Sequence, residues 1–553
     1  MIRGLEPSVF DSLERFVSAE LESRKHPGSS VAVVDGDEIV WSRGFGYANI
    51  EEGLEATPET IYGCASVTKT VVTFGFLQLM EAGKFNLDDP VNDHLDVKIK
   101  TDYDEEPVIR DLLTHYTGMP TRVPPLFYDR DRALTLEEYI AEAARTVRPP
   151  RRKWVYCNTS YTILGRLIEL WTGETYDRYI KNNVLEPLEM RFSDFDHTPC
   201  VLERLARGYK RAGGPENPLI PNERYVLGTL PQDPAGSLYS TVLDLGNFVI
   251  ANLNGGEFKG RRVLQEETVE EMHRLQMSPG KSNSGMALTW FRNMHDGHVM
   301  LSHTGGLPDY ANHVAFYPEL GIGICWLSNL RDDSVWRPPA PTALRILAGE
   351  EAPFNPSRIQ RIPENWKNLI GVYGDETVQH NLRFSNGYMM LDELILEEID
   401  ESRYMVHGST NDGYELTFEF GEDGFVRQFD LGNSFFSRYI EEKVEVEEGM
   451  ELEGVWRGEY VNSIGFHTLE LEIMGSSEGI AIDEDGNEIE LFEFSAESGI
   501  VNGSGVFEIP EEYARWGVLK EDEISLELKA VHGGLKGLLK SAFGTTLITF
   551  ERM

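Results

Sequence analysis

Strand-like runs stand at both ends of the first two thirds of the chain, with helical patterns between them. Apolar and β-branched residues flank Asp35-Gly36 within residues 29–41, which predicts a strand, a tight turn and a second strand. Short apolar runs at residues 298–302, 312–317 and 322–328 predict three further strands. Because these strands come from distant segments, we expect one sheet assembled across most of this region.

The segments between these strands carry helical periodicity. Residues 1–22 alternate charged and apolar residues as an amphipathic helix would, and an apolar stretch from Val71 to Met80 predicts a buried helix that Gly83 terminates. Further helical patterns lie at residues 136–146, 160–171 and 342–348. The expected fold class is α/β (α+β), with an antiparallel sheet flanked by helices and a helical subdomain.

Beyond a proline-rich stretch at residues 353–363 the pattern consists of strands alone. Gly371-Val372-Tyr373-Gly374 and Gly454-Val455-Trp456-Arg457-Gly458 each open a series of strands separated by turn signals. This degenerate repeat predicts two small antiparallel, lipocalin-like β-barrels. We therefore expect domains at residues 1–352, 364–443 and 449–553, with the acidic run at 441–451 joining the barrels.

The composition excludes several classes of function. A net charge of -41 repels nucleic acids and anionic lipid surfaces, and no apolar run approaches the roughly 18 residues that span a bilayer. The amino terminus lacks a secretory pattern, so we expect a cytoplasmic protein. The four cysteines are widely spaced and predict free thiols, and we expect no cofactor because zinc, Walker and dinucleotide motifs are missing from the sequence.

Ser66 and Lys69 stand at the head of the predicted Val71 helix. Side chains three residues apart share one helical face, so the lysine amine would stand beside the serine hydroxyl. A second Ser-x-x-Lys pattern, Ser278 to Lys281, contains Pro279 and Gly280, which break the helix that this alignment requires. Ser66 is therefore the candidate nucleophile.

Two further motifs carry chemistry. Tyr156-Cys157-Asn158 follows a proline-rich loop, where residues two apart point the same way, so the phenol and the amide would enter one pocket. His303-Thr304-Gly305-Gly306 ends a predicted strand, where small residues let a substrate backbone approach closely.

Together the three motifs resemble the penicillin-recognising serine hydrolases, which include class C β-lactamases, DD-peptidases, family VIII esterases and D-aminopeptidases. The resemblance covers roughly residues 5–350, and further matching stretches lie at residues 87–91, 112–118 and 234–240. It implies that Ser66 attacks a carbonyl, that Lys69 and Tyr156 handle its proton, and that Asn158 orients the substrate. It also implies that His303 stands where β-lactamases usually carry lysine, and that the Ser66 and Gly306 N–H groups form an oxyanion hole.

The general base stays open between two groups. Lys69 has to be neutral to accept a proton, although the unperturbed pKa of lysine is about 10.4, so burial or a cationic neighbour would have to stabilise the neutral amine. Alternatively, an ionised Tyr156 stabilised by a cationic Lys69 would be the base.

Three positions depart from the usual family pattern. His303 provides no fixed charge for a β-lactam carboxylate, so we expect feeble or no β-lactamase activity. Cys157 replaces a serine, and Arg151 replaces a glycine, which predicts a differently shaped loop. Arg151 also belongs to a basic island that either attracts an anionic substrate or neutralises nearby acidic surface; its members are Arg145, Arg148, Arg151, Arg152 and Lys153.

These observations predict a serine hydrolase with a Ser66 acyl-enzyme, acting on a small peptide in the manner of a D-aminopeptidase or DD-peptidase. The resemblance to D-aminopeptidases extends to the paired barrels, which in those enzymes restrict access to the cleft. A carboxylesterase acting on small esters is the alternative, and a ligand-binding protein that keeps the fold without turnover is a second alternative. Self-association into a homo-oligomer stays open.

Overall fold

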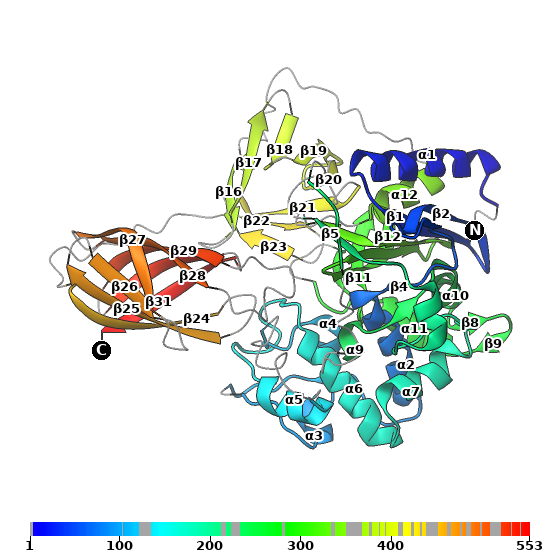
Figure 1. Ribbon diagram of the computed structural model, residues 1–553, viewed down its shortest axis with the longest axis horizontal. Helices are drawn as coiled ribbons and strands as arrows, with labels where there is room; N and C mark the ends of the chain where they lie inside the picture. The colour runs from blue at the N-terminus through cyan, green and yellow to red at the C-terminus, as the bar shows by residue number, and fades with distance from the viewer. Residues whose placement is uncertain are drawn as a thin grey trace.

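The computed structural model describes most of the chain. The described residues are 4–101, 103–120, 134–211, 217–222, 233–278, 283–332, 338–349, 368–374, 379–385, 388–392, 394–407, 413–421, 425–431, 434–437, 452–461, 466–475, 478–482, 488–497, 500–508, 521–531, 534–541 and 544–552. Figure 1 shows a large helix-and-strand region that contains the amino terminus, followed by two strand-only regions. The expected fold class, a helix-flanked antiparallel sheet followed by barrel-like strands, is confirmed.

An eight-stranded sheet forms the centre of the N-terminal region, which we define as the described part of residues 4–349. Its strand order is β10-β11-β12-β13-β14-β1-β2-β3. Its two halves meet where β1 pairs antiparallel with β14, with Val31 opposite Trp326. The sheet is thus built from both ends of the region, as the sequence predicts. The strand bounds are β1 (Gly28–Asp35), β2 (Glu38–Asn49), β3 (Leu54–Glu55), β10 (Gly285–Met286), β11 (Phe291–His295), β12 (His298–Leu307), β13 (Tyr310–Tyr317) and β14 (Ile322–Ser328).

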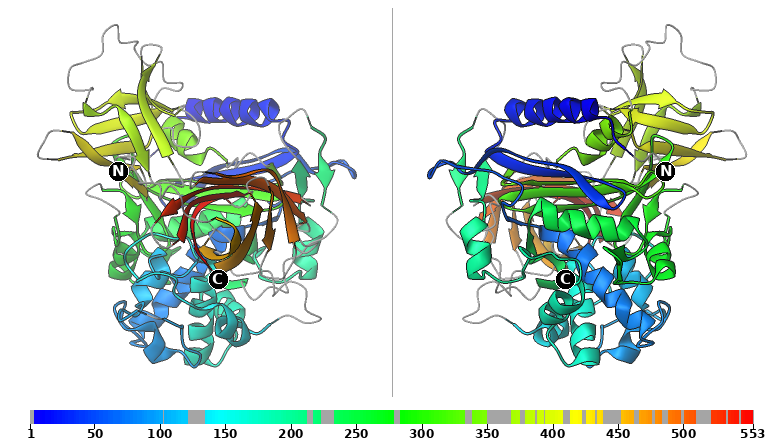
Figure 2. Two further views of the ribbon diagram at one scale, coloured as in Figure 1. Left: turned by 90° about the vertical axis from the view of Figure 1, so that its left-hand side faces the viewer. Right: turned by 90° about the vertical axis from the view of Figure 1, so that its right-hand side faces the viewer.

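Helices cover both faces of this sheet (Figure 2). Along β1, Val31 and Val33 belong to a core shared with α1 (Pro7–Ser23) and α12 (Ala340–Leu347). The alternate residues Ala32 and Val34 belong to the larger core on the opposite face, which includes α2 (Thr68–Glu81) and α10 (Val242–Leu253). The period of two along the strand therefore divides its side chains between the two layers.

The helical predictions agree with the structure to within a few residues. The predicted helices at 1–22, 136–146, 160–171 and 342–348 correspond to α1, α5 (Leu136–Ala143), α6 (Asn158–Thr172) and α12, and α2 ends just before Gly83, whose φ is 70°. Further helices within the described ranges are α3 (Val91–His94), α4 (Ile109–Thr114), α7 (Tyr176–Ile180), the π-helix η3 (Lys181–Leu185), α8 (Pro199–Arg204), α9 (Asp233–Gly236) and α11 (Glu266–His273).

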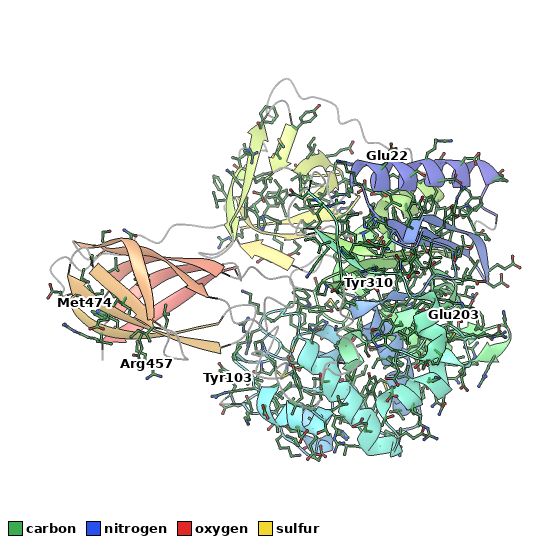
Figure 3. All side chains as sticks on the ribbon, in the orientation of Figure 1. Glu22, Tyr103, Glu203, Tyr310, Arg457 and Met474 are labelled. Carbon is green, nitrogen blue, oxygen red and sulfur yellow. The ribbon has the colours of Figure 1, made fainter. Side chains whose placement is uncertain are left out.

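Short strand pairs complete the N-terminal region. One pair lies directly before the candidate nucleophile, where β4 (Tyr62–Gly63) pairs with β7 (Tyr239–Ser240). The others are β5 (Tyr209–Arg211), β6 (Ile220–Pro221) and β15 (Leu330–Asp332) in one sheet, and β8 (Glu257–Phe258) with β9 (Arg261–Arg262). Tyr310, labelled in Figure 3, lies inside this region and donates its hydroxyl hydrogen to the Ala206 carbonyl oxygen at 2.6 Å.

The first strand-only region, hereafter the first barrel, is an eight-stranded antiparallel sheet whose first and last strands lie against each other. Its core contains Tyr373, Phe418 and Phe429. The strands are β16 (Gly371–Gly374), β17 (Gln379–Ser385), β18 (Tyr388–Leu391), β19 (Leu394–Glu398), β20 (Arg403–His407), β21 (Glu415–Phe420), β22 (Val426–Leu431) and β23 (Ser434–Ser437).

The second barrel is closed, because β24 pairs with both β25 and β31. Trp456 and Leu471 belong to its own buried core. The predicted antiparallel barrel is confirmed for this region, whereas the first region is a barrel-like sheet and the internal repeat stays a prediction. The strands are β24 (Gly454–Val461), β25 (Phe466–Gly475), β26 (Glu478–Ile482), β27 (Glu488–Glu497), β28 (Ile500–Glu508), β29 (Glu521–Val531), β30 (Gly534–Ser541) and β31 (Gly544–Arg552). The predicted boundaries at 352/364 and 443/449, the proline-rich stretch and the acidic run lie outside the described residues.

The first barrel contacts the N-terminal region at the hairpin between β11 and β12. The Asp296 N–H donates to the Gly413 carbonyl oxygen at 3.2 Å, and the rings of His295 and Tyr414 lie edge to face with centroids 5.5 Å apart. A Cβ on Gly413 would lie 2.5 Å from His295 Nε2, so this approach requires glycine. The contact fixes one end of the first barrel against the main sheet.

All four cysteines are free thiols, as the sequence predicts. Over the described ranges, none of the helices combines the length and the apolarity that crossing a bilayer requires.

Candidate active site

Ser66 lies in the 3-10 turn η1 (Ala65–Val67), which leads directly into α2. Ala65 before it has a φ of 51°, a left-handed conformation that is uncommon for a residue with a Cβ. The Thr68 hydroxyl accepts a hydrogen bond from the Leu238 N–H at 3.0 Å, which connects the start of α2 to the segment just before β7. The half-buried Ser66 is thus presented on a constrained turn at the head of a buried helix, as predicted.

Lys69 lies one turn further along and reaches back to the serine. Its Nζ is 3.1 Å from Ser66 Oγ and donates to the Ala235 carbonyl oxygen at 2.7 Å. The side chain is completely buried. The structure therefore brings the predicted nucleophile and amine into hydrogen-bond contact.

Burial lowers the pKa of Lys69 well below its ordinary value. In the part of the chain that the structure describes, no carboxylate forms an ion pair with this amine, so nothing there compensates a buried positive charge. The two polar partners also suit a neutral amine, which donates to Ala235 and accepts the hydroxyl hydrogen of Ser66. These observations favour Lys69 over ionised Tyr156 as the base.

Tyr156 lies beside Lys69, in the loop before α6. The Lys69 Nζ is 4.9 Å from the centroid of the Tyr156 ring and 5.3 Å from that of Tyr161. Cys157 is extended and Asn158 is the first residue of α6, where its side chain is half-buried. The Tyr156 ring thus lies beside the amine, whereas proton transfer by its hydroxyl and the substrate-orienting role of Asn158 stay predictions.

His303 lies on β12, and its ring is near Tyr156. Its ring is buried, and its centroid lies 6.4 Å from that of Tyr156 and 5.2 Å from that of Phe291. Its Nδ1–H donates to the Thr304 carbonyl oxygen at 2.8 Å. The third motif is therefore adjacent to the second, as the order of motifs predicts.

Gly305 brings the backbone of β12 against the nucleophile turn. A Cβ at this position would lie 2.1 Å from the Cys64 carbonyl oxygen, so only glycine permits the approach. Gly306 follows, opposite Ala311 of β13. This packing is what an oxyanion hole formed by the Ser66 and Gly306 N–H groups requires, and that hole stays a prediction.

Sequence reasoning assigned no role to several groups that line this site. His115 stacks on Tyr156 with ring centroids 4.3 Å apart, and Tyr161 is held by a 2.8 Å hydrogen bond from its hydroxyl to Thr289. Ala235 supplies a carbonyl oxygen to Lys69. His115 and Ala235 lie in the stretches 112–118 and 234–240, so the family resemblance marked the segments without indicating what these residues do.

The departures from the family pattern have local explanations. Cys157 is fully buried and burial raises the pKa of its thiol, so it is not an exposed nucleophile. Arg151 adopts a φ of 61°, the left-handed conformation that glycine takes freely, and its guanidinium pairs with the buried carboxylate of Asp111. Arg151 thus adopts a conformation that glycine takes more readily, and the predicted difference in loop shape stays a prediction.

The basic island is partly neutralised by acidic neighbours. Arg151 and Arg152 both contact Glu105, at 3.4 Å and 3.2 Å. This pairing favours charge neutralisation over attraction of an anionic substrate. Over the described residues, no cluster of three or more histidine, cysteine or acidic side chains is placed to hold a metal ion.

Comparison with known proteins agrees with this geometry. The Beta-lactamase family model matches residues 13–348, which is more than half of the chain. The chain belongs to the Beta-lactamase family. The predicted membership of the penicillin-recognising serine hydrolases is thereby confirmed.

One curated relative and two solved structures of other proteins illustrate how far the likeness of this Beta-lactamase family member extends. Protein flp of Staphylococcus aureus strain N315 is 25% identical over 334 residues, 58% of this chain and 64% of that protein, so the chain spans less than two thirds of flp. The octameric penicillin-binding protein homologue from Pyrococcus abyssi is 26% identical with a TM-score of 0.54, covering 77% of this chain and 99% of that one. The D-amino acid amidase from Ochrobactrum anthropi SV3, complexed with D-phenylalanine, has a TM-score of 0.52 at 20% identity and covers 62% of this chain and 98% of its own, which shows a shared fold.

Proposed function

We propose that this Beta-lactamase family member is a serine hydrolase that forms an acyl-enzyme on Ser66. The observation that carries the proposal is the 3.1 Å contact between Ser66 Oγ and the fully buried Nζ of Lys69. A serine hydroxyl is a weak nucleophile until a nearby base accepts its proton, and a neutral amine meets that need.

The reaction has two halves. In the first, the Ser66 oxygen bonds to the substrate carbonyl carbon while its proton passes to Lys69 Nζ. The bond to the leaving nitrogen or oxygen then breaks, and the leaving group takes a proton through Tyr156. In the second half, water attacks the acyl-enzyme, its proton returns through the same two groups, and the acid is released with Ser66 restored. Backbone N–H donors on the developing oxyanion would each contribute about 3 to 4 kcal/mol.

We propose small peptides as the substrate class, with a preference for D-residues or for a free N-terminal amino group. His303 supports a substrate other than a β-lactam, because a neutral imidazole offers no fixed charge to the carboxylate of a β-lactam. The carboxylesterase alternative differs only in the leaving group. Relative rates on D- and L-aminoacyl anilides, p-nitrophenyl esters and nitrocefin separate these activities, and ester cleavage without amide cleavage would overturn the peptidase assignment.

Active-site labelling tests the hydrolase proposal directly. A fluorophosphonate should add to the peptide that bears Ser66, and Ser66→Ala should abolish both the adduct and turnover without unfolding the protein. Ser278→Ala is the matched control, because it removes the serine of the second Ser-x-x-Lys pattern. A mass shift that persists in Ser66→Ala would place the nucleophile at another residue, and no shift on the Ser66 peptide of the native chain would favour a ligand-binding protein without turnover.

A homo-oligomer is a further proposal, prompted by the octameric state of the Pyrococcus abyssi homologue. Light scattering of the full chain tests it, and a monomer at all concentrations would contradict it.

A further inference from the structure

His115 holds the Tyr156 loop from both sides. The Val155 N–H donates to the His115 carbonyl oxygen at 3.0 Å, and the Cys157 N–H donates to His115 Nδ1, also at 3.0 Å. These two donors come from the residues immediately before and after Tyr156. A single residue therefore fixes the backbone on either side of the phenol.

The His115 ring also sets the orientation of the phenol. It lies under Tyr156 with centroids 4.3 Å apart and a tilt of 35°, and it faces Tyr161 at 5.5 Å. Tyr161 is the second ring beside the Lys69 amine, at 5.3 Å. His115 thus packs between the two aromatic rings that face Lys69.

The hydrogen bond from Cys157 fixes the protonation of this histidine. Because Nδ1 accepts a hydrogen bond it carries no proton, so the ring is neutral and its proton lies on Nε2. The side chain is completely buried, and this burial lowers the pKa of His115 well below its usual value. The acceptor is therefore maintained across the neutral pH range.

His115 has a left-handed backbone conformation, in which glycine would be expected, so the presence of a side chain calls for a reason. Its φ of 64° is the left-handed conformation that ends α4, where glycine is ordinarily favoured. Histidine, asparagine and aspartate tolerate it better than other residues. Glycine would satisfy the helix end but would provide neither the ring nor the acceptor for Cys157.

We propose that His115 is a positioning residue that holds the Tyr156 phenol against Lys69 through its Nδ1 acceptor and its stacked ring. The inference rests on the proposed function, because Tyr156 matters here as the group that transfers the proton.

Two substitutions separate the acceptor from the ring. His115→Phe keeps a stacked ring but leaves the buried Cys157 N–H without an acceptor. His115→Asn places an amide oxygen near the position of Nδ1 and suits the left-handed backbone. We expect the Phe variant to lose about 100-fold in kcat on an amide substrate, the scale expected of a misplaced catalytic group, and the Asn variant to retain a kcat within about tenfold of the native chain.

A double-mutant cycle with Tyr156→Phe distinguishes positioning from general destabilisation. If His115 acts through Tyr156, then the His115→Phe/Tyr156→Phe double variant should cleave an amide substrate no more slowly than Tyr156→Phe alone. His273→Phe is the matched control, because His273 is another neutral histidine of the same region, with Nε2 3.1 Å from Asn252 Oδ1 and its ring packed against Phe316. The His273→Phe variant should leave kcat on the amide substrate unchanged.

Each outcome decides the inference. Additive losses in the cycle, or an Asn variant as slow as the Phe variant, would overturn the positioning role while native labelling at Ser66 leaves the proposed function intact. An unlabelled native chain would remove the proposed function and the inference with it. If His115→Phe does not fold, the His115→Asn variant alone tests the inference. A loss of activity in His115→Asn equal to that of Tyr156→Phe would then overturn the positioning role.

Discussion

Replacing Lys69 by methionine should change the pH dependence of stability as well as abolish turnover. Methionine has a similar length and no titrating group, so it removes the buried amine without opening a large cavity. It also removes the donor to the Ala235 carbonyl oxygen, a cost that does not vary with pH. The pH-dependent part of the difference therefore reports the ionisation of Lys69 alone.

The sign and size of this difference follow from proton linkage. Lys69 is buried and its pKa is lowered in the folded chain, whereas in the unfolded chain it titrates near 10.4. Between these two values the unfolded chain binds the extra proton, so the free energy of unfolding of the native chain rises with pH. The slope relative to Lys69→Met should approach about 1.4 kcal/mol per pH unit, and it should vanish below the folded pKa and above about 10.4.

Scanning calorimetry of both proteins from about pH 7 to about pH 9.5 measures this slope, and each kcal/mol corresponds to about 2 °C of melting temperature in a large domain. Lys181→Met is the control, because Lys181 is partly exposed and pairs with Asp194 at 2.6 Å, which raises its pKa. That lysine stays charged in both states over the range, so its variant should differ from the native chain by a constant amount. If the difference in the free energy of unfolding between Lys69→Met and the native chain were also constant over this pH range, a neutral Lys69 would be refuted.

Three further outcomes are expected. The value of kcat/KM should fall as pH drops through the lowered pKa of Lys69, because the base must be deprotonated, and a pH profile that stays flat down to the titration of substrate would contradict this role. Gly305→Ala places a Cβ 2.1 Å from the Cys64 carbonyl oxygen and should lower kcat by about 100-fold. Gly236→Ala is the control, because its Cβ would lie 3.9 Å from its nearest neighbour and should be tolerated. Equal activities of the two variants would refute the packing argument. Deletion of residues 364–553 should widen the range of substrates cleaved if the barrels restrict access, and an unchanged ranking of substrates would exclude that restriction.

The elements that the sequence predicts correctly are those whose signal is local. The strand that contains Val31 to Val34 and the helix α2 are both continuous apolar runs, which neighbours in sequence reveal. How the side chains of the strand divide between the two layers becomes visible only in the structure. The contact of Ser66 with Lys69 is likewise local, since one helical turn separates them.

The supporting groups of the site could not be predicted in the same way. His115 bonds a backbone N–H that lies 42 residues further along, and Ala235 contributes a carbonyl oxygen that any residue would carry. Neither interaction leaves a periodic or compositional signal, because each depends on how separate loops meet in space. The left-handed backbone of His115 is equally invisible in the sequence.

The first barrel reaches the same supporting segment. Tyr116, which directly follows His115, is almost fully buried, and its pKa is raised to about 12 by burial and by the nearby carboxylate of Asp430 in β22. The Tyr116 carbonyl oxygen also accepts a hydrogen bond from the Arg151 N–H at 2.7 Å, at the start of the loop that leads to Tyr156. Removing the barrels therefore alters the surroundings of the catalytic loop as well as access to it. A restriction of access would change KM and the ranking of substrates, whereas a loosened Tyr156 would lower kcat for every substrate alike, as in the His115 variants. Only the first pattern would assign substrate selection to the barrels.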